Sequence, residues 1–460
     1  MGFVLSVLYF VTSYLTPAVL FGPFAGARIE LILAVLVCLI SLPALLRSFI
    51  LKTSQSLALI GLAFATFLSV LIELHWLGGA VRSLLTFIPN AFAYFLLCLH
   101  CNSRKKLQAV VVMLVFVCLF VIVNGSIDLL HGIPESANHL PDIVQRWSVE
   151  HPYLFPMSNG EGEMFYRLRG LGEINDPNDF GQLIICVVPL VFIFWRPKRA
   201  LRNFVIVILP VCALLYGTFL THSRGALLAL IAIAIVAIRR RIGTLPALLL
   251  AGGVFVGAMA LHFTGGRDIS ASAGEDRTEL WSQSLQLLKS HPLFGVGAGN
   301  LPDYLGHTAH NSAMVCAAEL GMFGLFFWCL FLFPTIRDAL VVASPEKVSE
   351  SDQPIPEEGP LHLAAKKVET VDKAEINRLG RLLLLSLTGF LVAGFFLSRA
   401  FVLTFFLLGG MVEVVYEMAL QRGMIAPRMR LARILPYAGG LAVFLVLVVY
   451  VMLRILNLVR

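Results

Sequence analysis

The sequence predicts an all-α, polytopic membrane protein of about 12–13 transmembrane helices with two sizeable extracytoplasmic loops. Apolar residues make up 58% and charged residues 14% of the 460 positions, whereas soluble domains carry roughly 45–50% and about 25%. Mean hydropathy is +0.85. A spanning helix needs about 20 apolar residues, so thirteen helices would use about 260 residues. This composition excludes an assembly of soluble domains.

Thirteen apolar runs define the predicted helices. Each is long enough, or nearly so, to cross as a helix, whereas barrel strands alternate over about ten residues. Whether the first and the eighth run cross fully is left open. The runs cover residues 3–20, 30–46, 56–74, 83–100, 107–124, 180–195, 203–220, 225–238, 245–262, 311–336, 380–397, 400–420 and 435–457.

The distribution of basic residues predicts the orientation. With the N-terminus in the cytoplasm, the short cytoplasmic loops hold 16 Lys and Arg, and the short loops on the other side hold four, Arg28, Arg82, Arg224 and Arg399. Such a bias marks the cytoplasmic side. The net charge of +7 then bears on topology and on contact with anionic membrane lipids, and no nucleic acid is expected as a partner.

The helices and loops divide the chain into seven parts. The two outer loops carry aromatic residues, and the cytoplasmic segment is charged and without apolar periodicity, as in a flexible linker. The parts are N-terminal transmembrane helices 1–124, an extracytoplasmic loop 125–178, central transmembrane helices 179–262, an extracytoplasmic loop 263–310, a transmembrane helix 311–339, a cytoplasmic flexible linker 340–378 and C-terminal transmembrane helices 379–460.

Within the second outer loop, Trp281, Leu285 and Leu288 fall at i, i+4 and i+7. This spacing predicts an amphipathic helix over Thr278–Ser290 that lies on the outer membrane surface. Arg277 directly precedes it. Gly295, Gly297 and Gly299 follow, and glycines at alternate positions permit a tight turn or close backbone approach.

A short outer turn, residues 221–223, joins two predicted spans. Ser223 is a plausible N-cap, which puts Arg224 in the first turn of the next helix. A cation there opposes the helix dipole, and an anion held by the guanidinium and the free amides would relieve this. The alternative, equally weighted on this motif, is an arginine that reaches lipid headgroups.

Upstream, Arg167 and Arg169 lie just outside the membrane, where they could contact either headgroups or a bound phosphate. They precede Asp176-Pro177-Asn178-Asp179. Asp176 as N-cap, Pro177 at the first and Asp179 at the third helical position explain this motif better than a metal site does.

His310-Asn311-Ser312 enters the tenth predicted span. A histidine at the boundary with water access can act as a general base, although an interfacial histidine that caps the helix is the simpler reading for His310 alone. Glu319 lies nine residues on and would face away from His310 on a straight helix. As an intramembrane carboxylate it is a functional candidate, or it packs against an arginine of another span.

Together these motifs put several arginines and one histidine on one membrane face, which suits a lipid with more than one phosphate and a proton to be removed. Their order resembles the O-antigen ligase family of polysaccharide-assembling membrane enzymes. The matching parts are Arg169-Gly170 with residues 176–179, Ser223-Arg224-Gly225-Ala226, Arg277 with Trp281, residues 292–297, and His310-Asn311-Ser312 with Glu319-Leu320-Gly321.

This resemblance implies an inverting, metal-independent glycosyl transfer on the outer face of the bacterial plasma membrane, without a cofactor. The donor would be a glycan on undecaprenyl diphosphate. His310 would deprotonate the acceptor hydroxyl, and Arg224, Arg277 and Arg169 would bind the diphosphate. Supporting roles fall to Arg167, Asn311, Glu319 and Asp179. The long first outer loop and the cytoplasmic linker depart from the family pattern.

The acceptor stays open between lipid A core, as in a ligase, another lipid-linked glycan, as in a polymerase, and a protein. A transporter or flippase of lipid-linked glycans is the alternative function; it predicts ionisable groups near the midplane and an internal repeat, neither of which is evident. A membrane scaffold is the third class, and it would tolerate substitution of His310 and Arg224.

Overall fold

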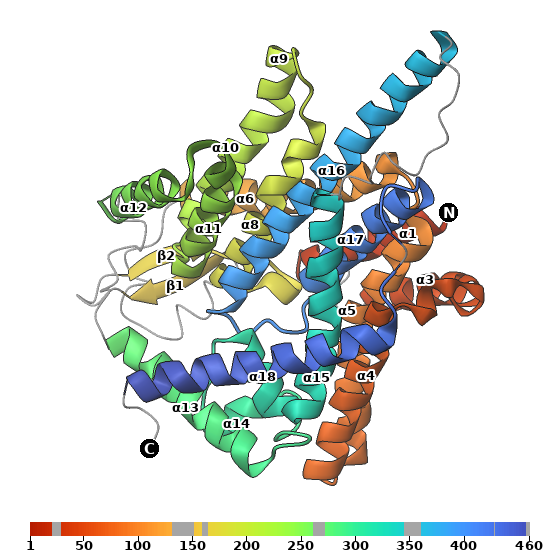
Figure 1. The fold of residues 1–460 in the computed structure, drawn as a ribbon. Coiled ribbons are helices and arrows are strands. Elements are labelled where there is room, and N and C mark those ends of the chain that lie inside the picture. Colours follow the sequence, from red (N-terminus) through yellow and green to blue (C-terminus); the bar gives the residue numbers. More distant parts are fainter. Residues whose placement is uncertain are drawn as a thin grey trace.

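The computed structural model describes residues 1–20, 29–130, 151–158, 164–260, 272–344, 360–426 and 428–456, and these are almost entirely helical (Figure 1). The helices are α1 (Gly2–Leu15), α2 (Pro17–Leu20), α3 (Ile29–Arg47), α4 (Ser54–Glu73), α5 (Leu77–His100), α6 (Arg104–Leu130), α8 (Pro177–Val191), α9 (Ala200–Asn203), α10 (Leu209–Leu220), α11 (Arg224–Ile242), α12 (Thr244–Ala260), α13 (Ser272–Ser290), α14 (Leu301–Leu305), α15 (Ser312–Ala343), α16 (Pro360–Gly394), α17 (Leu403–Gln421) and α18 (Leu431–Ile455). An antiparallel hairpin joins β1 (Leu154–Ser158) to β2 (Met164–Leu168), with Phe155 opposite Arg167.

The all-α membrane class is confirmed. Within the described residues, ten helical stretches are long and apolar enough to cross a bilayer, and they correspond to ten of the thirteen predicted runs. The remaining three runs are α1, α11 and α12. The apolar parts of α1 and α12 are shorter, Gly2–Leu15 and Thr244–Gly257, and α11 carries Arg224 at its start and Arg239, Arg240 and Arg241 near its end.

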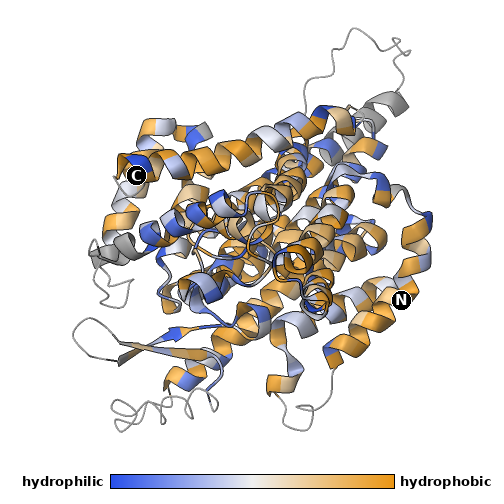
Figure 2. Cartoon of the chain, turned by 90° about the horizontal axis from the view of Figure 1, so that it is seen from below, coloured by the Kyte–Doolittle hydropathy of each residue, from blue (hydrophilic) through white to orange (hydrophobic). Residues whose placement is uncertain are grey.

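The centre of the bundle is formed by α15 and α17. Helix α15 packs against α4, α16, α17 and α18, and α17 packs against α5. Figure 1 shows α18 running across the bundle and α16 extending beyond it. Figure 2 shows that hydrophobic residues cover most of the helical surface. Outward-facing apolar side chains such as Leu39 of α3, 68% exposed, are what a bilayer would cover.

Helix α15 is interrupted at Gly321, whose φ of 66° and ψ of −169° are not helical. A segment that we call the glycine turn, residues 292–299, fills the interruption. Its Val296 and Gly297 N–H groups donate to the Ala318 and Glu319 carbonyls, at 2.9 and 3.0 Å. In return, its Pro292 and Leu293 carbonyls accept from the Met322 and Phe323 N–H groups. The break is therefore fully bonded, as non-helical backbone at membrane depth must be.

The predicted turn of alternate glycines is thereby observed, and its glycines are required. Gly295, Gly297 and Gly299 have φ of 68°, 99° and 79°, a region that side chains with a Cβ rarely adopt. A Cβ on Gly295 would also lie 2.4 Å from the Glu319 carbonyl carbon. No residue other than glycine fits there without moving backbone.

The predicted linker over residues 340–378 differs from the structure at both ends. Helix α15 continues to Ala343, and α16 already begins at Pro360; residues 345–359 lie outside the described residues. The part of α16 around residues 375–376, which falls within the predicted linker, makes tertiary contacts that composition does not reveal. Glu375 forms an ion pair with Arg104, and Ile376 is buried.

The amphipathic helix predicted over Thr278–Ser290 is observed within α13, but its apolar face covers protein rather than the membrane surface. Trp281 and Leu288 are buried, and α13 packs against α15 and α18. The Trp281 Nε1–H donates to the Ala309 carbonyl at 2.7 Å, and its ring lies 5.3 Å from that of Phe395. Periodicity identifies an apolar face but not what covers it.

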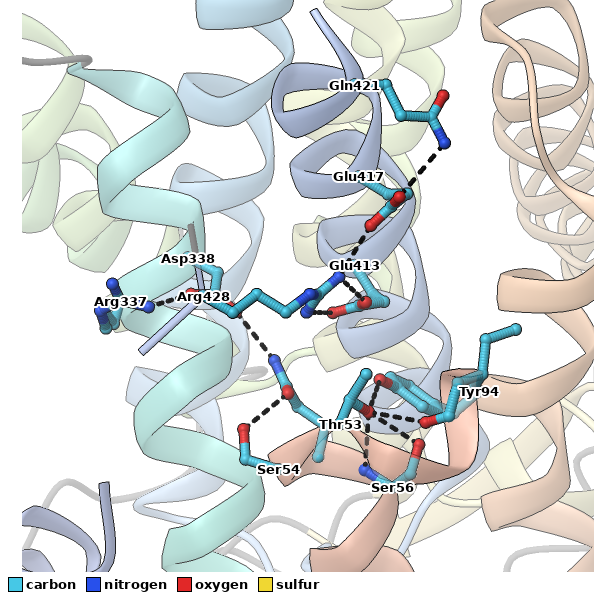
Figure 3. A network of polar contacts seen from close by, with 12 residues as sticks. Thr53, Ser54, Ser56, Tyr94, Arg337, Asp338, Glu413, Glu417, Gln421 and Arg428 are labelled. Carbon is cyan, nitrogen blue, oxygen red and sulfur yellow. Dashed lines mark hydrogen bonds and ion pairs between the residues drawn. The ribbon is translucent and has the colours of Figure 1, made fainter. Parts of the chain in front are cut away.

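A buried polar network ties helix ends together on the side that the charge distribution predicts to be cytoplasmic (Figure 3). Arg428 pairs with Glu413 and Glu417, and Asp338 accepts hydrogen bonds from Gln55 and Arg337, both at 2.9 Å. Because Glu413 and Asp338 are nearly inaccessible, removal of one partner would leave a buried charge. We assign this network a structural role.

Candidate functional site

The predicted site residues come from four segments of the chain that meet at the other end of the bundle. They are the hairpin with the start of α8, the α10–α11 turn, the start of α13 and the residues before α15. A fifth segment, residues 395–402 between α16 and α17, joins them and was not predicted. Two hydrogen bonds hold the 395–402 segment: the His310 N–H donates to the Ser398 hydroxyl, and the Ser312 hydroxyl donates to the Leu397 carbonyl.

The α10–α11 turn has the predicted geometry. Ser223 is the N-cap of α11, its hydroxyl accepts from the Ala226 N–H at 3.3 Å, and Arg224 is the first helical residue. His222 before it has a φ of 48° and its ring packs against those of Phe165 and Phe219. The Ser223 cap and the packing of the His222 ring thus fix the backbone of the turn directly before Arg224.

Arg167 fixes this turn rather than facing headgroups. Its side chain is only 3% exposed. The Nε–H donates to the Thr221 carbonyl at the end of α10, and one terminal nitrogen donates to Asn178 Oδ1, both at 2.9 Å. These bonds tie β2 to α10 and α8, so the contact with headgroups or phosphate that the sequence predicted for Arg167 is not what the structure describes.

Arg169 lies one pleat further along and is partly exposed. Its Nε–H donates to the Pro152 carbonyl at 2.9 Å, and its guanidinium lies over the Phe155 ring at 5.9 Å. Burial lowers the pKa of Arg169 below its ordinary value, and the nearby Asp176 carboxylate opposes this. Because Arg169 is partly exposed whereas Arg167 is buried, Arg169 is the better candidate of the pair for an anion.

Arg277 lies within electrostatic reach of Arg224 and of His310, although the three are far apart in the sequence. Burial lowers the pKa of Arg277, and the positive charge of Arg224 lowers it further. Burial likewise lowers the pKa of His310, and the charge of Arg277 adds to this effect. We call Arg169, Arg224, Arg277 and His310 the cationic cluster.

His310 is held by its backbone. Its φ is 47°, and its N–H donates to the Ser398 hydroxyl at 2.8 Å. Asn311 follows as the N-cap of α15, with its Oδ1 accepting from the Ala313 and Met314 N–H groups. Helix α15 therefore begins after His310, and the His310 backbone is fixed directly before its first turn. Asn311 is 1% exposed, and its Nδ2 has no hydrogen-bond partner among the described residues.

The Asp176 carboxylate shifts the pKa of several groups around it. As predicted, it caps α8, accepting from the Asn178 N–H at 2.7 Å, with Pro177 at the first helical position. Its carboxylate raises the pKa of His310, against the lowering by burial, Arg277 and His307. It also raises the pKa of Arg169 and Arg399. The cap predicted from sequence is therefore also the negative charge nearest the cationic cluster.

Asp179, predicted as part of this helix start and in a supporting role at the site, forms an ion pair with Arg399 of the 395–402 segment. Although burial alone would lower the pKa of Arg399, the Asp179 carboxylate raises it above its ordinary value. The only sequence signal for Arg399 was its presence on the side that is poor in basic residues. Its partner could not be read from the sequence, because the two are separated by 220 positions.

Glu319 neither faces His310 nor pairs with an arginine in the described contacts. Its carboxylate accepts hydrogen bonds from the backbone N–H groups of Gly299 and Leu301, which stabilises the end of the glycine turn. The angle between His310 and Glu319 that was predicted for one straight helix does not apply, because α15 starts at Ser312, after His310. An arginine partner was a reasonable alternative, but backbone amides of the glycine turn satisfy the charge instead.

Beside the cationic cluster lies a cavity of about 620 Å³ between α4, α5, the glycine turn and the 395–402 segment. Glu319, Ser398 and Arg399 line it, together with Trp76, Arg82 and Glu173. The residues of the cationic cluster do not line it. Sequence reasoning missed this cavity, since its charged residues come from four separate segments. We call it the balanced cavity, because its lining holds two arginines and two glutamates.

Two comparisons with known proteins bear on this arrangement. No curated protein matches the chain. Residues 209–329 match the family model described as O-antigen ligase. That stretch contains Arg224, Arg277, His310 and Glu319, whereas Arg169, Asp179 and Arg399 lie outside it. The match supports an O-antigen ligase-like family, and the described residues include ten apolar helices of spanning length, as in a multi-pass membrane protein.

Proposed function

We propose that the protein transfers a glycan from undecaprenyl diphosphate to an acceptor hydroxyl on the outer face of the bacterial plasma membrane. The family is one of membrane enzymes that transfer glycans in the manner of O-antigen ligases or polymerases. The single observation that carries the finer proposal is the electrostatic coupling of Arg224, Arg277 and His310, which come from three segments of the chain.

In the proposed step, the His310 imidazole accepts the proton of the acceptor hydroxyl. The freed oxygen attacks the anomeric carbon of the donor sugar from the face opposite the diphosphate. The new carbon–oxygen bond forms as the bond between this carbon and the phosphate oxygen breaks, and the electron pair leaves with undecaprenyl diphosphate. The configuration at the anomeric carbon is inverted.

Each side chain supports this step by its charge. Burial and Arg277 keep the pKa of His310 low, so the imidazole is neutral and able to accept a proton near pH 7. Arg224 and Arg277 repel each other in the absence of an anion, and a diphosphate between them would relieve the repulsion. Guanidinium groups bind phosphates in bidentate geometry and can stabilise charge that develops on the leaving group. The proposed reaction therefore assigns no metal and no cofactor.

The test uses cells that depend on this protein for a surface glycan. His310→Ala and Arg224→Ala should abolish the glycan and leave lipid-linked precursor on the outer face of the membrane, at normal protein levels. Arg239→Ala, at the opposite end of the same helix as Arg224, is the matched control and should leave the glycan intact. Precursor that is trapped inside would favour a flippase. Normal glycan from both site variants would refute the transferase.

A further inference from the structure

The balanced cavity differs from the cationic cluster in the ligand that it suits. Its lining holds as many glutamates as arginines, and Arg399 is already paired with Asp179, so it offers a diphosphate less positive charge than the cationic cluster does. Its volume of about 620 Å³ lies within the range of sites for small organic ligands, about 300–1,000 Å³. Charge balance favours an uncharged or weakly charged polar ligand.

Polar groups of the lining are held in place by hydrogen bonds to backbone. The Glu173 carboxylate accepts from the Leu403 N–H at 3.1 Å, and the Asn90 Nδ2–H donates to the Phe401 carbonyl at 3.2 Å. Glu319 is fixed by the glycine turn. Carboxylate, amide and guanidinium groups in fixed positions can bind neighbouring hydroxyls of a ligand with little loss of side-chain entropy.

Trp76 gives the cavity an aromatic surface. Its ring is packed against the start of α5, where a Cβ on Gly79 would lie 2.2 Å from the ring. The side chain is nevertheless 56% exposed. Gly78 and Gly79 therefore let the indole lie close to the helix while much of it remains uncovered. A flat aromatic surface beside fixed polar groups suits a sugar ring, which has an apolar C–H face and a rim of hydroxyls.

The cavity reaches the cationic cluster along the 395–402 segment. Ser398 and Thr308 line the cavity, and the Ser398 hydroxyl accepts the His310 N–H. Arg399 lines the cavity and pairs with Asp179 of α8. A ligand in the cavity would thus lie next to the backbone that holds the proposed base.

We propose that the balanced cavity binds sugar residues of the acceptor glycan, so that its reacting hydroxyl extends past Ser398 to His310. This assignment rests on the proposed transferase. It divides the two substrates between neighbouring regions, with the donor diphosphate in the cationic cluster and the acceptor sugars between Trp76 and Arg399. The specificity for the acceptor then resides largely outside the stretch that matches the family model.

The test measures binding directly in the purified full-length protein. The probes are two labelled, lipid-free oligosaccharides, released by mild acid from the acceptor fraction and from the undecaprenyl-linked fraction of cells that lack this gene. Equilibrium dialysis should show saturable binding of the acceptor oligosaccharide. Trp76→Ala should weaken it about tenfold, and Ser83→Trp, which fills the cavity, should abolish it.

Leu85→Trp is the matched control, because Leu85 lies on the same helix, is 64% exposed and does not line the cavity. Its binding should equal that of the wild type, with thermal unfolding confirming that all variants fold. No binding to the wild type, equal binding to Ser83→Trp, or loss of donor-glycan binding alone would overturn the assignment. His310→Ala should bind the acceptor normally. Binding without any transfer by the wild type would refute the transferase and leave the cavity assignment standing.

Discussion

The cationic cluster and the balanced cavity lie side by side but are built in different ways. The cluster holds three arginines and His310, with the Asp176 carboxylate acting on Arg169 and His310, whereas the lining of the cavity holds two arginines and two glutamates. The 395–402 segment separates them, with Ser398 bonded to His310 and Arg399 bonded to Asp179. One boundary thus divides a region suited to an anion from one suited to a neutral ligand.

This difference explains why motif reasoning found one region and missed the other. Cations close to hydrocarbon are costly and therefore conspicuous in a sequence. Charged residues of a lining that contains both signs are harder to recognise in a sequence, because each can be explained as an ordinary interfacial residue. A substrate site that binds by shape and hydrogen bonds leaves a weaker mark on the sequence than one that binds by charge.

The largest effect should come from removing one guanidinium on each side of the boundary. Arg277→Gln should lower the transfer rate about 10²–10³-fold, the usual consequence of losing a group that stabilises a leaving charge. Arg82→Gln removes the same charge from the cavity and should raise the acceptor KM about tenfold while kcat stays within about twofold. Steady-state kinetics in proteoliposomes measure both. If Arg277→Gln and Arg82→Gln lower kcat equally, the two regions do not have the separate roles proposed here.

A smaller effect concerns the glycine turn, which forms one wall of the cavity. Gly295→Ala combines a positive φ with a backbone clash at 2.4 Å, so the free energy of unfolding should fall by about 2–3 kcal/mol. Gly299→Ala has a positive φ but open space around it and should cost about 1 kcal/mol. Thermal unfolding in detergent compares the two. If Gly299→Ala proves as damaging, close approach of the turn to α15 is not what requires the glycine.

The smallest effect is a shift in pH dependence. Asp176→Asn keeps the N-cap but removes the carboxylate that raises the pKa of His310. The pKa of His310 should therefore fall, the base should stay neutral to a lower pH, and the acid limb of kcat/KM should move to lower pH. Asp303→Asn, an exposed acid of α14, should leave it unmoved. An upward shift with Asp176→Asn would contradict the assignment of His310 as the base.

Much of the fold could be predicted because membrane spans depend on local composition. Ten of the apolar runs correspond to helices of spanning length, and the caps at Asp176, Ser223 and Asn311 follow from residues within one helical turn. Local chemistry also identified the glycine turn, although not its place against α15. The hairpin was not predicted, since it depends on pairing between two strands, and neither was the helical start of α16.

The site was predicted where a side chain carries charge and missed where a partner decides its role. Arg277 lies within electrostatic reach of Arg224 and of His310, whereas Arg167 donates to the Thr221 carbonyl. Arg399 was counted only for topology, and its pairing with Asp179 required three-dimensional proximity. The role of Glu319 depends on backbone amides at the end of the glycine turn, and a pattern of side chains does not predict a backbone partner.

The mutual hydrogen bonds between the glycine turn and the interrupted α15 make two distant stretches of chain interdependent. Neither the turn nor the second half of that helix can satisfy its own amides and carbonyls alone at this depth. Grafting the outer loop of another protein onto this scaffold should therefore fail unless the matching helix travels with it. During membrane insertion, the backbone of α15 around Gly321 can form these hydrogen bonds only once the glycine turn has packed against it. We therefore expect the glycine turn and α15 to assemble as one unit.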